Sequence, residues 1–238
     1  MDPVVIAGRT PILLVADHAS NIVPDDIALD IDPALLDEHV AIDIGTDALT
    51  RRLAELLDAS AVIAGVSRLV LDLNREPDAA GLIPESSDGR TIPGNSGLSL
   101  EVREARLRRF HIPYHDAITA MIERVQPRLL VAMHSFTPSL LTRPELTRPW
   151  PVGILYNEDE RAARPMIAAL RGQGMHVGDN EPYSGRELNY TMNRHAEGRG
   201  LPYINIEVRQ DLLETAEDIE GWAQRLADAV SATAATLA

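Results

Sequence analysis

The sequence contains no cysteine and no lysine, and it has no long hydrophobic run. The absence of cysteine excludes disulfide bonds, thiolate nucleophiles and cysteine-rich zinc sites. Any metal ion must therefore be bound by histidine, aspartate, glutamate or asparagine. All 22 basic residues are arginine, which we attribute to genome composition rather than to function.

No apolar stretch approaches the roughly 18 residues of a membrane span. The N-terminus, Met1-Asp2-Pro3, lacks the basic and apolar segments of a signal peptide, so we expect a soluble, cytoplasmic protein. The net charge of −14 argues against general binding to nucleic acid or to anionic membranes. A small anionic substrate could still be bound by a local group of arginines. The sequence does not indicate an oligomeric state.

The 238 residues fit a single domain, 1–238, without an internal repeat or a linker. Short apolar segments typical of strands alternate with amphipathic segments typical of helices. Extended segments are predicted over 12–16, 60–64, 68–75, 129–134, 152–157 and 203–209, and helices over 33–39, 46–58, 100–126, 159–172, 189–198 and 215–237. This alternation predicts an α/β fold with a mostly parallel sheet covered by helices on both faces. Residues 1–10 are predicted to be a short lead-in, and 76–99 and 137–151 to be long loops.

Polar residues stand at or near the ends of four of these extended segments. The apolar run 12–16 leads into His18, and the three other runs supply the remaining groups. They are Asn74 with Arg75, His134, and Glu207 with Arg209. Because open α/β sheets bind ligands beyond the carboxyl ends of their strands, we expect these side chains to converge there.

Two histidines, a carboxylate and arginines are the groups that a mononuclear metal hydrolase needs. A catalytic zinc takes three protein ligands and leaves a position for water, whose pKa it lowers. A carboxylate can then transfer the proton from water to the leaving nitrogen. Arginine binds a substrate carboxylate through paired hydrogen bonds.

Each of these residues also has a simpler interpretation. Glu207 could be a solvated residue of an alternating strand with Arg209 as its partner, and Asn74-Arg75 could simply begin a loop. His111 and His115 are spaced for one helix face, which permits metal binding but favours a structural pair. Structural or surface roles are the default for the single histidines, which are His39, His176 and His195.

Several motifs together resemble the N-formylglutamate amidohydrolase family, which is similar to zinc carboxypeptidases and aspartoacylase-like enzymes. The most specific of them is Ser67-Arg-Leu-Val-Leu-Asp-Leu-Asn-Arg75. The others are Asp17-His-Ala-Ser20, Asp43-Ile-Gly45, Pro113-Tyr-His115, Met133-His-Ser135, Asn180-Glu-Pro-Tyr-Ser-Gly185 and Ile206-Glu-Val-Arg-Gln-Asp-Leu212. They extend over residues 11–213. The resemblance implies a zinc-carboxypeptidase-like α/β fold with a mixed central sheet.

The resemblance also implies roles for individual residues. His18 and His134 would bind one zinc ion, Glu207 would be the general base, and Asn74-Arg75 would bind a substrate carboxylate. In the related enzymes a glutamate stands three residues after the first histidine, whereas this chain has Asn21 there. Because asparagine is a poor zinc ligand, Asp43 is our candidate for the third ligand. Arg68 is the candidate for oxyanion stabilisation, and Arg209, Tyr183 and His195 are candidates for binding a second carboxylate.

We therefore expect a zinc-dependent amidohydrolase that cleaves the acyl C–N bond of an N-acyl amino acid, with N-formyl-L-glutamate as the favoured substrate. One alternative is another N-acyl amino acid or a small peptide, selected by the loops at 76–99 and 137–151. A second alternative is a non-catalytic protein that binds an anionic metabolite on the same scaffold, which the missing glutamate at Asn21 favours.

Overall fold

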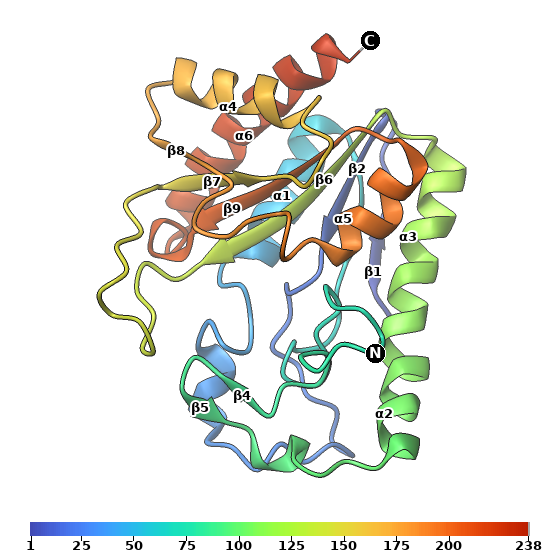
Figure 1. Ribbon diagram of the computed structural model, residues 1–238. Coiled ribbons are helices and arrows are strands. Elements are labelled where there is room, and N and C mark those ends of the chain that lie inside the picture. The colour runs from blue at the N-terminus through green and yellow to red at the C-terminus, as the bar shows by residue number, and fades with distance from the viewer. Residues whose placement is uncertain (238) are drawn as a thin grey trace.

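A seven-stranded mixed sheet forms the centre of the protein, as the computed structural model of residues 1–237 shows (Figure 1). Ala238, the last residue of the predicted domain, lies outside the described residues. The strand order is β1-β3-β2-β6-β9-β7-β8. Their bounds are β1 (Val4–Ile6), β2 (Ile12–Ala16), β3 (Ser60–Ile63), β6 (Leu129–Phe136), β7 (Val152–Leu155), β8 (Val177–Asp179) and β9 (Tyr203–Arg209).

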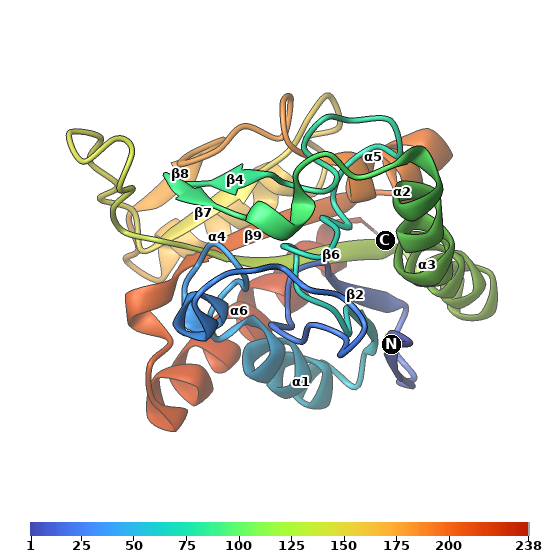
Figure 2. The same ribbon diagram turned by 90° about the horizontal axis from the view of Figure 1, so that it is seen from below.

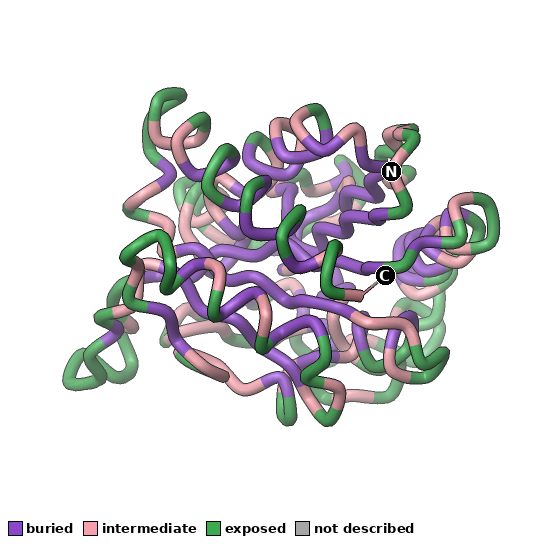
Figure 3. Tube along the Cα trace, turned by 90° about the horizontal axis from the view of Figure 1, so that it is seen from above, coloured by how far each residue is buried: buried purple, intermediate pink, exposed green. Residues whose placement is uncertain are grey.

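The four inner strands β3, β2, β6 and β9 run parallel to one another. β1 is antiparallel to β3, and β7 is antiparallel to β9, so the sheet is mixed as predicted. Every residue of β2 and of β6 is buried, because both faces of these strands are covered. Figure 3 shows buried segments through the middle of the molecule and exposed segments towards its periphery. This explains why they appear in the sequence as unbroken apolar runs.

Helices cover the two faces of the sheet, which confirms the predicted layers. Three of them, α1 (Thr46–Leu57), α4 (Ala163–Gly172) and α6 (Ala216–Thr236), form one layer in which α6 packs against α1 and α4. On the other face, α3 (Ile112–Val125) contacts β2, β3 and α5 (Tyr190–His195). Figure 2 shows α1 and α6 on one side of the sheet and α5 on the other.

One long helical segment replaces the predicted helix 100–126. It consists of α2 (Leu100–Arg106), a π-helical turn (Leu107–His111) and α3. Pro113 lacks an N–H, and its ring would clash with the carbonyl four residues earlier in a regular α-helix. The wider turn directly before it accommodates this proline.

Several local predictions are wrong. The strand β8 was not predicted. Residues 4–6 of the expected lead-in form the edge strand β1. The expected extended segment 68–75 instead folds into turns, because Ser67 bonds locally: its carbonyl accepts from Val70 N–H at 2.9 Å and its hydroxyl from Leu69 N–H at 3.2 Å. These turns place the polar residues of the segment beside the ends of the parallel strands.

The long loops lie beyond the carboxyl ends of the inner strands. The first contains a small hairpin of β4 (Ser86–Ser87) and β5 (Arg90–Thr91), visible below the sheet in Figure 1, and a 3₁₀ turn at Pro93–Asn95. A 3₁₀ helix at Pro33–Asp37 takes the place of the helix predicted at 33–39. Among residues 1–237, no helix combines the length and the apolar character that a membrane span requires.

Candidate metal centre and surrounding cavity

Three residues from different elements meet at the carboxyl end of the inner strands. His18 follows β2, Asp43 precedes α1, and His134 lies on β6. The Asp43 N–H donates to the His18 carbonyl at 3.0 Å, and Ser135 Oγ donates to the Ile44 carbonyl at 2.7 Å. These two bonds hold the segment before α1 between the ends of β2 and β6, so Asp43 is positioned between the two histidines.

The turn that follows Asp43 requires glycine. Gly45 has a φ of 80°, which side-chain-bearing residues rarely adopt. A Cβ atom at this position would also lie 2.6 Å from the Cβ of Leu213. The close approach to the segment after β9 thus fixes where α1 begins and where the Asp43 carboxylate points.

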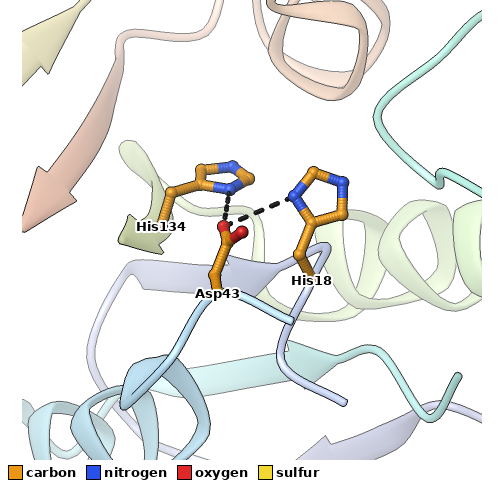
Figure 4. A group of neighbouring side chains, drawn as sticks. All are labelled: His18, Asp43 and His134. Atoms are coloured by element: carbon orange, nitrogen blue, oxygen red, sulfur yellow. Dashed lines mark hydrogen bonds and ion pairs between the residues drawn. The ribbon is translucent and has the colours of Figure 1, made fainter. Parts of the chain in front are cut away.

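The side chains of His18, Asp43 and His134 form one buried group (Figure 4). Each offers a ligand atom, and these atoms all lie within 4.8 Å of one another. Asp43 Oδ2 lies 2.8 Å from His134 Nδ1 and 3.4 Å from His18 Nδ1. A tetrahedral zinc with ligand bonds near 2.1 Å separates its ligand atoms by roughly 3.4 Å. The spacing therefore suits a small divalent cation.

Two further carboxylates face the outer nitrogens of the histidines. Asp72 Oδ1 lies 2.7 Å from His18 Nε2, and Asp17 Oδ2 lies 3.4 Å from His134 Nε2. Asp17 is held in turn by Tyr114, whose hydroxyl donates to Asp17 Oδ1 at 2.7 Å. For His18, a carboxylate in this position places the proton on Nε2 and leaves Nδ1 free to bind a metal. In His134, Nδ1 is bonded to Asp43 at 2.8 Å, and Nε2 has no hydrogen-bond partner within residues 1–237.

Arg68 is the cation that the protein itself supplies to this cluster. Its Nη1 donates to Asp43 Oδ1 at 3.1 Å and its Nη2 to Asp72 Oδ2 at 2.9 Å. Burial would raise the pKa of Asp43, but the nearby charge of His18, the short contacts with both histidines and the charge of Arg68 lower that pKa below its usual value. The pKa of Asp72 is likewise lowered, against burial, by His18 and Arg68.

The donor set and the local charge both fit a bound divalent metal ion. Nδ1 of His18 is buried and has no hydrogen-bond partner within residues 1–237. Four buried carboxylates surround the two histidines, namely Asp17, Asp43, Asp72 and Glu207, and Arg68 and Arg75 form ion pairs with Asp43 and Asp72. A divalent cation between the histidines would be attracted by these carboxylates. Two imidazoles and a carboxylate are ligands that zinc accepts.

Glu207 lies beside this group on the neighbouring strand. It is paired in register with His134 across β6 and β9, and it is only 6% exposed. Burial raises the pKa of Glu207 to about 7, and the Asp43 charge acts in the same direction against His134 and His18. Its Oε2 atom is buried without a partner in the described part of the chain. A carboxylate with a pKa near neutrality can both accept and donate a proton.

A cavity of about 640 Å³ opens over the metal-binding group. His18, Asp43, His134 and Glu207 all line it. Four other predicted site residues line it as well: Arg68, Asn74, Arg75 and Tyr183. Asn74 Oδ1 accepts from the Thr191 N–H at 2.9 Å, so the amide nitrogen of Asn74 is the atom left for a ligand. The Arg75 side chain is 32% exposed, and its Nε is 3.9 Å from Asp72 Oδ2.

The two other candidates for carboxylate binding lie elsewhere. Arg209 does not line the cavity, and its Nε donates to Asp211 Oδ1 at 2.7 Å. His195 is fully buried, and its Nε2 lies 2.8 Å from Nδ1 of His115. We therefore assign neither residue a direct contact with substrate.

His195 belongs to a cluster with His111 and His115. The Nε2 atoms of His111 and His115 bond the carbonyls of Arg75 and Leu73 at 3.1 and 3.0 Å. These contacts agree with the structural role favoured for His111 and His115, since they fix the backbone on both sides of Asn74. Because a carbonyl only accepts, Nε2 of His115 is the donor, and its Nδ1 must accept from His195.

Three important residues were not identified from the sequence. Asp17 and Asp72 occur within recognised motifs, and their positions next to His18 and close to Asn74 were a usable signal. Arg148 lines the cavity from the loop 137–151, where no pattern distinguished it from other arginines. Asn21, by contrast, does not line the cavity and donates to Asp37 Oδ1 at 3.0 Å, so the absence of a glutamate at position 21 leaves the group of His18, Asp43 and His134 intact.

The chain is similar to known proteins over nearly its whole length. The sequence profile of the N-formylglutamate amidohydrolase family matches residues 10–214. The structure is similar to that of an Agrobacterium tumefaciens gene product, with a TM-score of 0.92, 32% identity and coverage of 98% of this chain and 94% of that one. It shares its fold with N-formylglutamate amidohydrolase from Ralstonia eutropha JMP134, with a TM-score of 0.77, 18% identity and coverage of 98% and 97%. A search of curated protein sequences gave no match.

Proposed function

Because the chain belongs to the N-formylglutamate amidohydrolase family, we propose that it is a metal-dependent hydrolase of the acyl C–N bond in N-acyl amino acids. N-formyl-L-glutamate is the favoured substrate, and formate and L-glutamate are its products. The observation that supports this proposal most strongly is the buried group of His18, Asp43 and His134 with Glu207 beside it in one cavity.

The proposed metal is a single zinc ion held by His18 Nδ1, Asp43 Oδ2 and His134 Nδ1. When bound, it would supply Lewis acidity that polarises the acyl carbonyl and activates water for attack. Asp72 and Asp17 orient the two imidazole rings from their outer nitrogens. Arg68 fixes the Asp43 and Asp72 carboxylates relative to each other.

Glu207 is the proposed general base and acid. It takes a proton from the attacking water as the new C–O bond forms at the acyl carbon. It then delivers that proton to the amide nitrogen as the C–N bond breaks, so that a neutral amine leaves. Its unpartnered Oε2 and its pKa of about 7 suit both transfers near neutral pH.

The remaining cavity residues are proposed to hold the substrate. Asn74 and Arg75 bind the α-carboxylate, which leaves the acyl group facing the metal-binding side chains. Arg68 retains N–H groups beyond those bonded to Asp43 and Asp72, so it can donate to the oxyanion that develops on the acyl oxygen. A preorganised donor of this type stabilises a transition state by about 3 kcal/mol.

Release of formate from N-formyl-L-glutamate by zinc-reconstituted protein tests the proposal. Glu207→Gln should lower kcat by about 10²–10⁴-fold, since it removes the proton acceptor, while zinc stays bound. Full activity of this variant would exclude Glu207 as the base. Zinc-free protein that gains no activity on zinc addition, yet binds the substrate, would instead identify a non-catalytic binding protein.

The size of the cavity supports a second candidate within the same chemistry. About 640 Å³ lies within the range of roughly 300–1,000 Å³ that accommodates drug-sized ligands. Larger N-acyl amino acids or small peptides therefore have room to bind. Values of kcat/KM for N-formyl, N-acetyl and dipeptide substrates separate the two candidates, because a formyl-specific enzyme favours the first by orders of magnitude.

A further inference from the structure

Arg148 is a buried arginine that faces the cavity from the loop between β6 and β7. It is only 8% exposed, although its neighbours Thr147 and Pro149 are exposed. It lines the same cavity as the metal-binding group. A guanidinium buried to this degree usually has a carboxylate partner, because an unpaired buried charge is costly.

No acidic residue within 1–237 forms an ion pair with Arg148. Its Nη1 donates instead to two uncharged acceptors, the Thr137 carbonyl and the Tyr183 hydroxyl oxygen, each at 3.0 Å. Arg68, which lines the same cavity, is by contrast paired with both Asp43 and Asp72. Arg148 therefore provides a positive charge that the described side chains do not neutralise.

One edge of the Arg148 guanidinium has no hydrogen-bond partner among the described residues. Both of its bonds to Thr137 and Tyr183 involve Nη1, so Nε and Nη2 have no partner in the described chain. These two nitrogens form the edge of the guanidinium that binds a carboxylate through two parallel hydrogen bonds. Arg148 lines a cavity large enough for a substrate.

Arg148 is also held rigidly. Its guanidinium stacks on the Tyr183 ring, with the central carbon 4.8 Å from the ring centroid. Its carbonyl accepts from Arg209 Nη1 at 3.4 Å, and the Arg209 N–H donates to the Pro151 carbonyl at 3.0 Å. Arg209 thus supports the backbone of the Arg148 loop, although it does not line the cavity itself. A preorganised cation loses little entropy when it binds an anion.

We propose that Arg148 and Tyr183 form a subsite for the side-chain carboxylate of a dianionic N-acyl amino acid, an inference that rests on the proposed function. The α-carboxylate then lies at Arg75, a cavity arginine close to Asp72 and next to Asn74. The Tyr183 hydroxyl accepts from Arg148 and keeps its own hydrogen to donate to the same carboxylate. Arg148 thereby determines specificity for an acidic over a neutral side chain.

The test compares N-formyl-L-glutamate with N-formyl-L-glutamine, which has nearly the same shape and one charge fewer. Zinc-reconstituted wild-type protein should favour the glutamate derivative in kcat/KM by about 100-fold, the effect of one charge-assisted bidentate contact. Arg148→Gln should remove most of this preference by lowering kcat/KM for the glutamate derivative. Arg148→Lys, which keeps the charge but not the paired donors, should retain an intermediate preference.

Arg143→Gln is the matched control, because Arg143 lies on the same loop, lines the same cavity and is exposed. The preference of the Arg143→Gln protein for the glutamate over the glutamine derivative should stay within about 3-fold of the wild-type preference, since an exposed charge is screened by solvent. An equal loss of activity on both substrates in Arg148→Gln, or no loss at all, would overturn the subsite and assign Arg148 a structural role.

Calorimetric binding separates the subsite from the reaction. Both compounds are titrated into the Glu207→Gln protein, with and without Arg148→Gln, so that turnover does not interfere. A selective loss of affinity for the glutamate derivative supports the subsite even if the wild-type protein releases no formate. If the glutamate derivative bound with equal affinity to the proteins with and without Arg148→Gln, the subsite would be refuted, whether or not the wild-type protein releases formate.

Discussion

Asp72 bonds to three groups that belong to different parts of the site. Its Oδ1 contacts His18 Nε2 at 2.7 Å and accepts from the Asn74 N–H at 3.0 Å, while its Oδ2 accepts from Arg68 at 2.9 Å. One carboxylate thus orients a metal-binding imidazole and also positions the segment proposed to bind substrate. Its importance follows from these contacts rather than from any direct role in the reaction.

Asp72→Asn should lower zinc affinity by about 10–100-fold, because an amide orients His18 less well and no longer makes Nδ1 more basic. Competition with a chromophoric chelator measures this change. Asp37→Asn is the control, since Asp37 bonds Asn21 away from the cavity. Unchanged zinc affinity in Asp72→Asn would show that His18 does not depend on this carboxylate.

At the residue scale, the sequence pointed to His18, His134 and Glu207, which lie at or near the ends of buried strands and line one cavity. Their convergence follows from a parallel sheet. Asp17 and Asp72 were missed although they occur in motifs, and Arg209, at the end of β9, does not line the cavity. Arg148 could not be predicted, because its burial and its lack of a carboxylate partner depend on the packing of a loop against Tyr183 and Phe136. Pairing of charges is a tertiary property that a one-dimensional pattern does not contain.

The packing of α3 against α5 encloses a pair of histidines that are kept neutral. Burial is the main cause that lowers the pKa of His195 to about 4 and that of His115 to about 3. Both pKa values lie below the pKa of about 6.5 that a histidine has in an unfolded chain. Between about pH 4 and pH 6.5 the unfolded chain therefore binds more protons than the folded protein. The stability that these two histidines contribute is complete above about pH 6.5 and is lost as the pH falls towards 4.

As the pH falls from about 6.5 towards 4, the free energy of unfolding should decrease. Each of these histidines should contribute about 1.4 kcal/mol per pH unit to that decrease. His195→Gln should reduce the slope, as measured by urea unfolding at a series of pH values between 4 and 6.5. His176→Gln, at an exposed position, should retain the wild-type slope. The same slope in all three proteins would contradict the neutral buried pair.

Close packing of β7 and β8 against the turn 180–184 positions Tyr183. A Cβ atom on Gly153 would lie 2.0 Å from the Glu181 carbonyl oxygen, and one on Gly178 would lie 2.5 Å from it. Gly153 is also the register partner of Glu207 on β9. These glycines allow the turn to approach the sheet closely enough for Tyr183 to reach the cavity.

Gly153→Ala should destabilise the protein by about 1–3 kcal/mol, because the backbone of the turn must move to accommodate the methyl group. It should also raise KM, since Tyr183 moves with the turn. Gly172→Ala at the end of α4 is the control, where a Cβ would meet nothing within 4 Å and stability should change by less than about 1 kcal/mol. Equal thermal unfolding of the two variants would argue against the close contact.

At the element scale, the predictions failed where local bonding outweighed the hydrophobic pattern. The apolar residues of 68–75 suggested an extended segment, but Ser67 caps a turn and directs Arg68 and Asp72 towards the site. The strand β1 was missed because only three residues pair with β3 at the edge of the sheet. Neither feature has a strong periodic signal.

For the molecule as a whole, the alternation of strands and helices was sufficient to predict the layered α/β fold. The mixed character of the sheet came from family resemblance, because periodicity does not reveal that β7 runs antiparallel to β9. The excess of buried carboxylates around His18 and His134 is also a property of the assembled fold. A zinc ion bound there, as proposed, would contribute to the stability of the protein as well as to its proposed chemistry.

Removal of zinc should therefore lower the melting temperature. A ligand present at 100 times its dissociation constant stabilises the native state by about 2.7 kcal/mol, which corresponds to a few degrees for a chain of this size. Calorimetry of zinc-loaded and chelator-treated protein measures the shift. An unchanged melting temperature would mean that the native state does not bind zinc preferentially.

The zinc content of dialysed, zinc-reconstituted protein, measured by elemental analysis, tests the proposed metal site without reference to activity. One zinc per chain is expected in the wild type and in Glu207→Gln, and a loss of that zinc is expected in His134→Ala and in Asp43→Ala. A wild-type protein that retains no zinc, or an equal zinc content in all four proteins, would contradict the assignment of His18, Asp43 and His134 as the metal ligands.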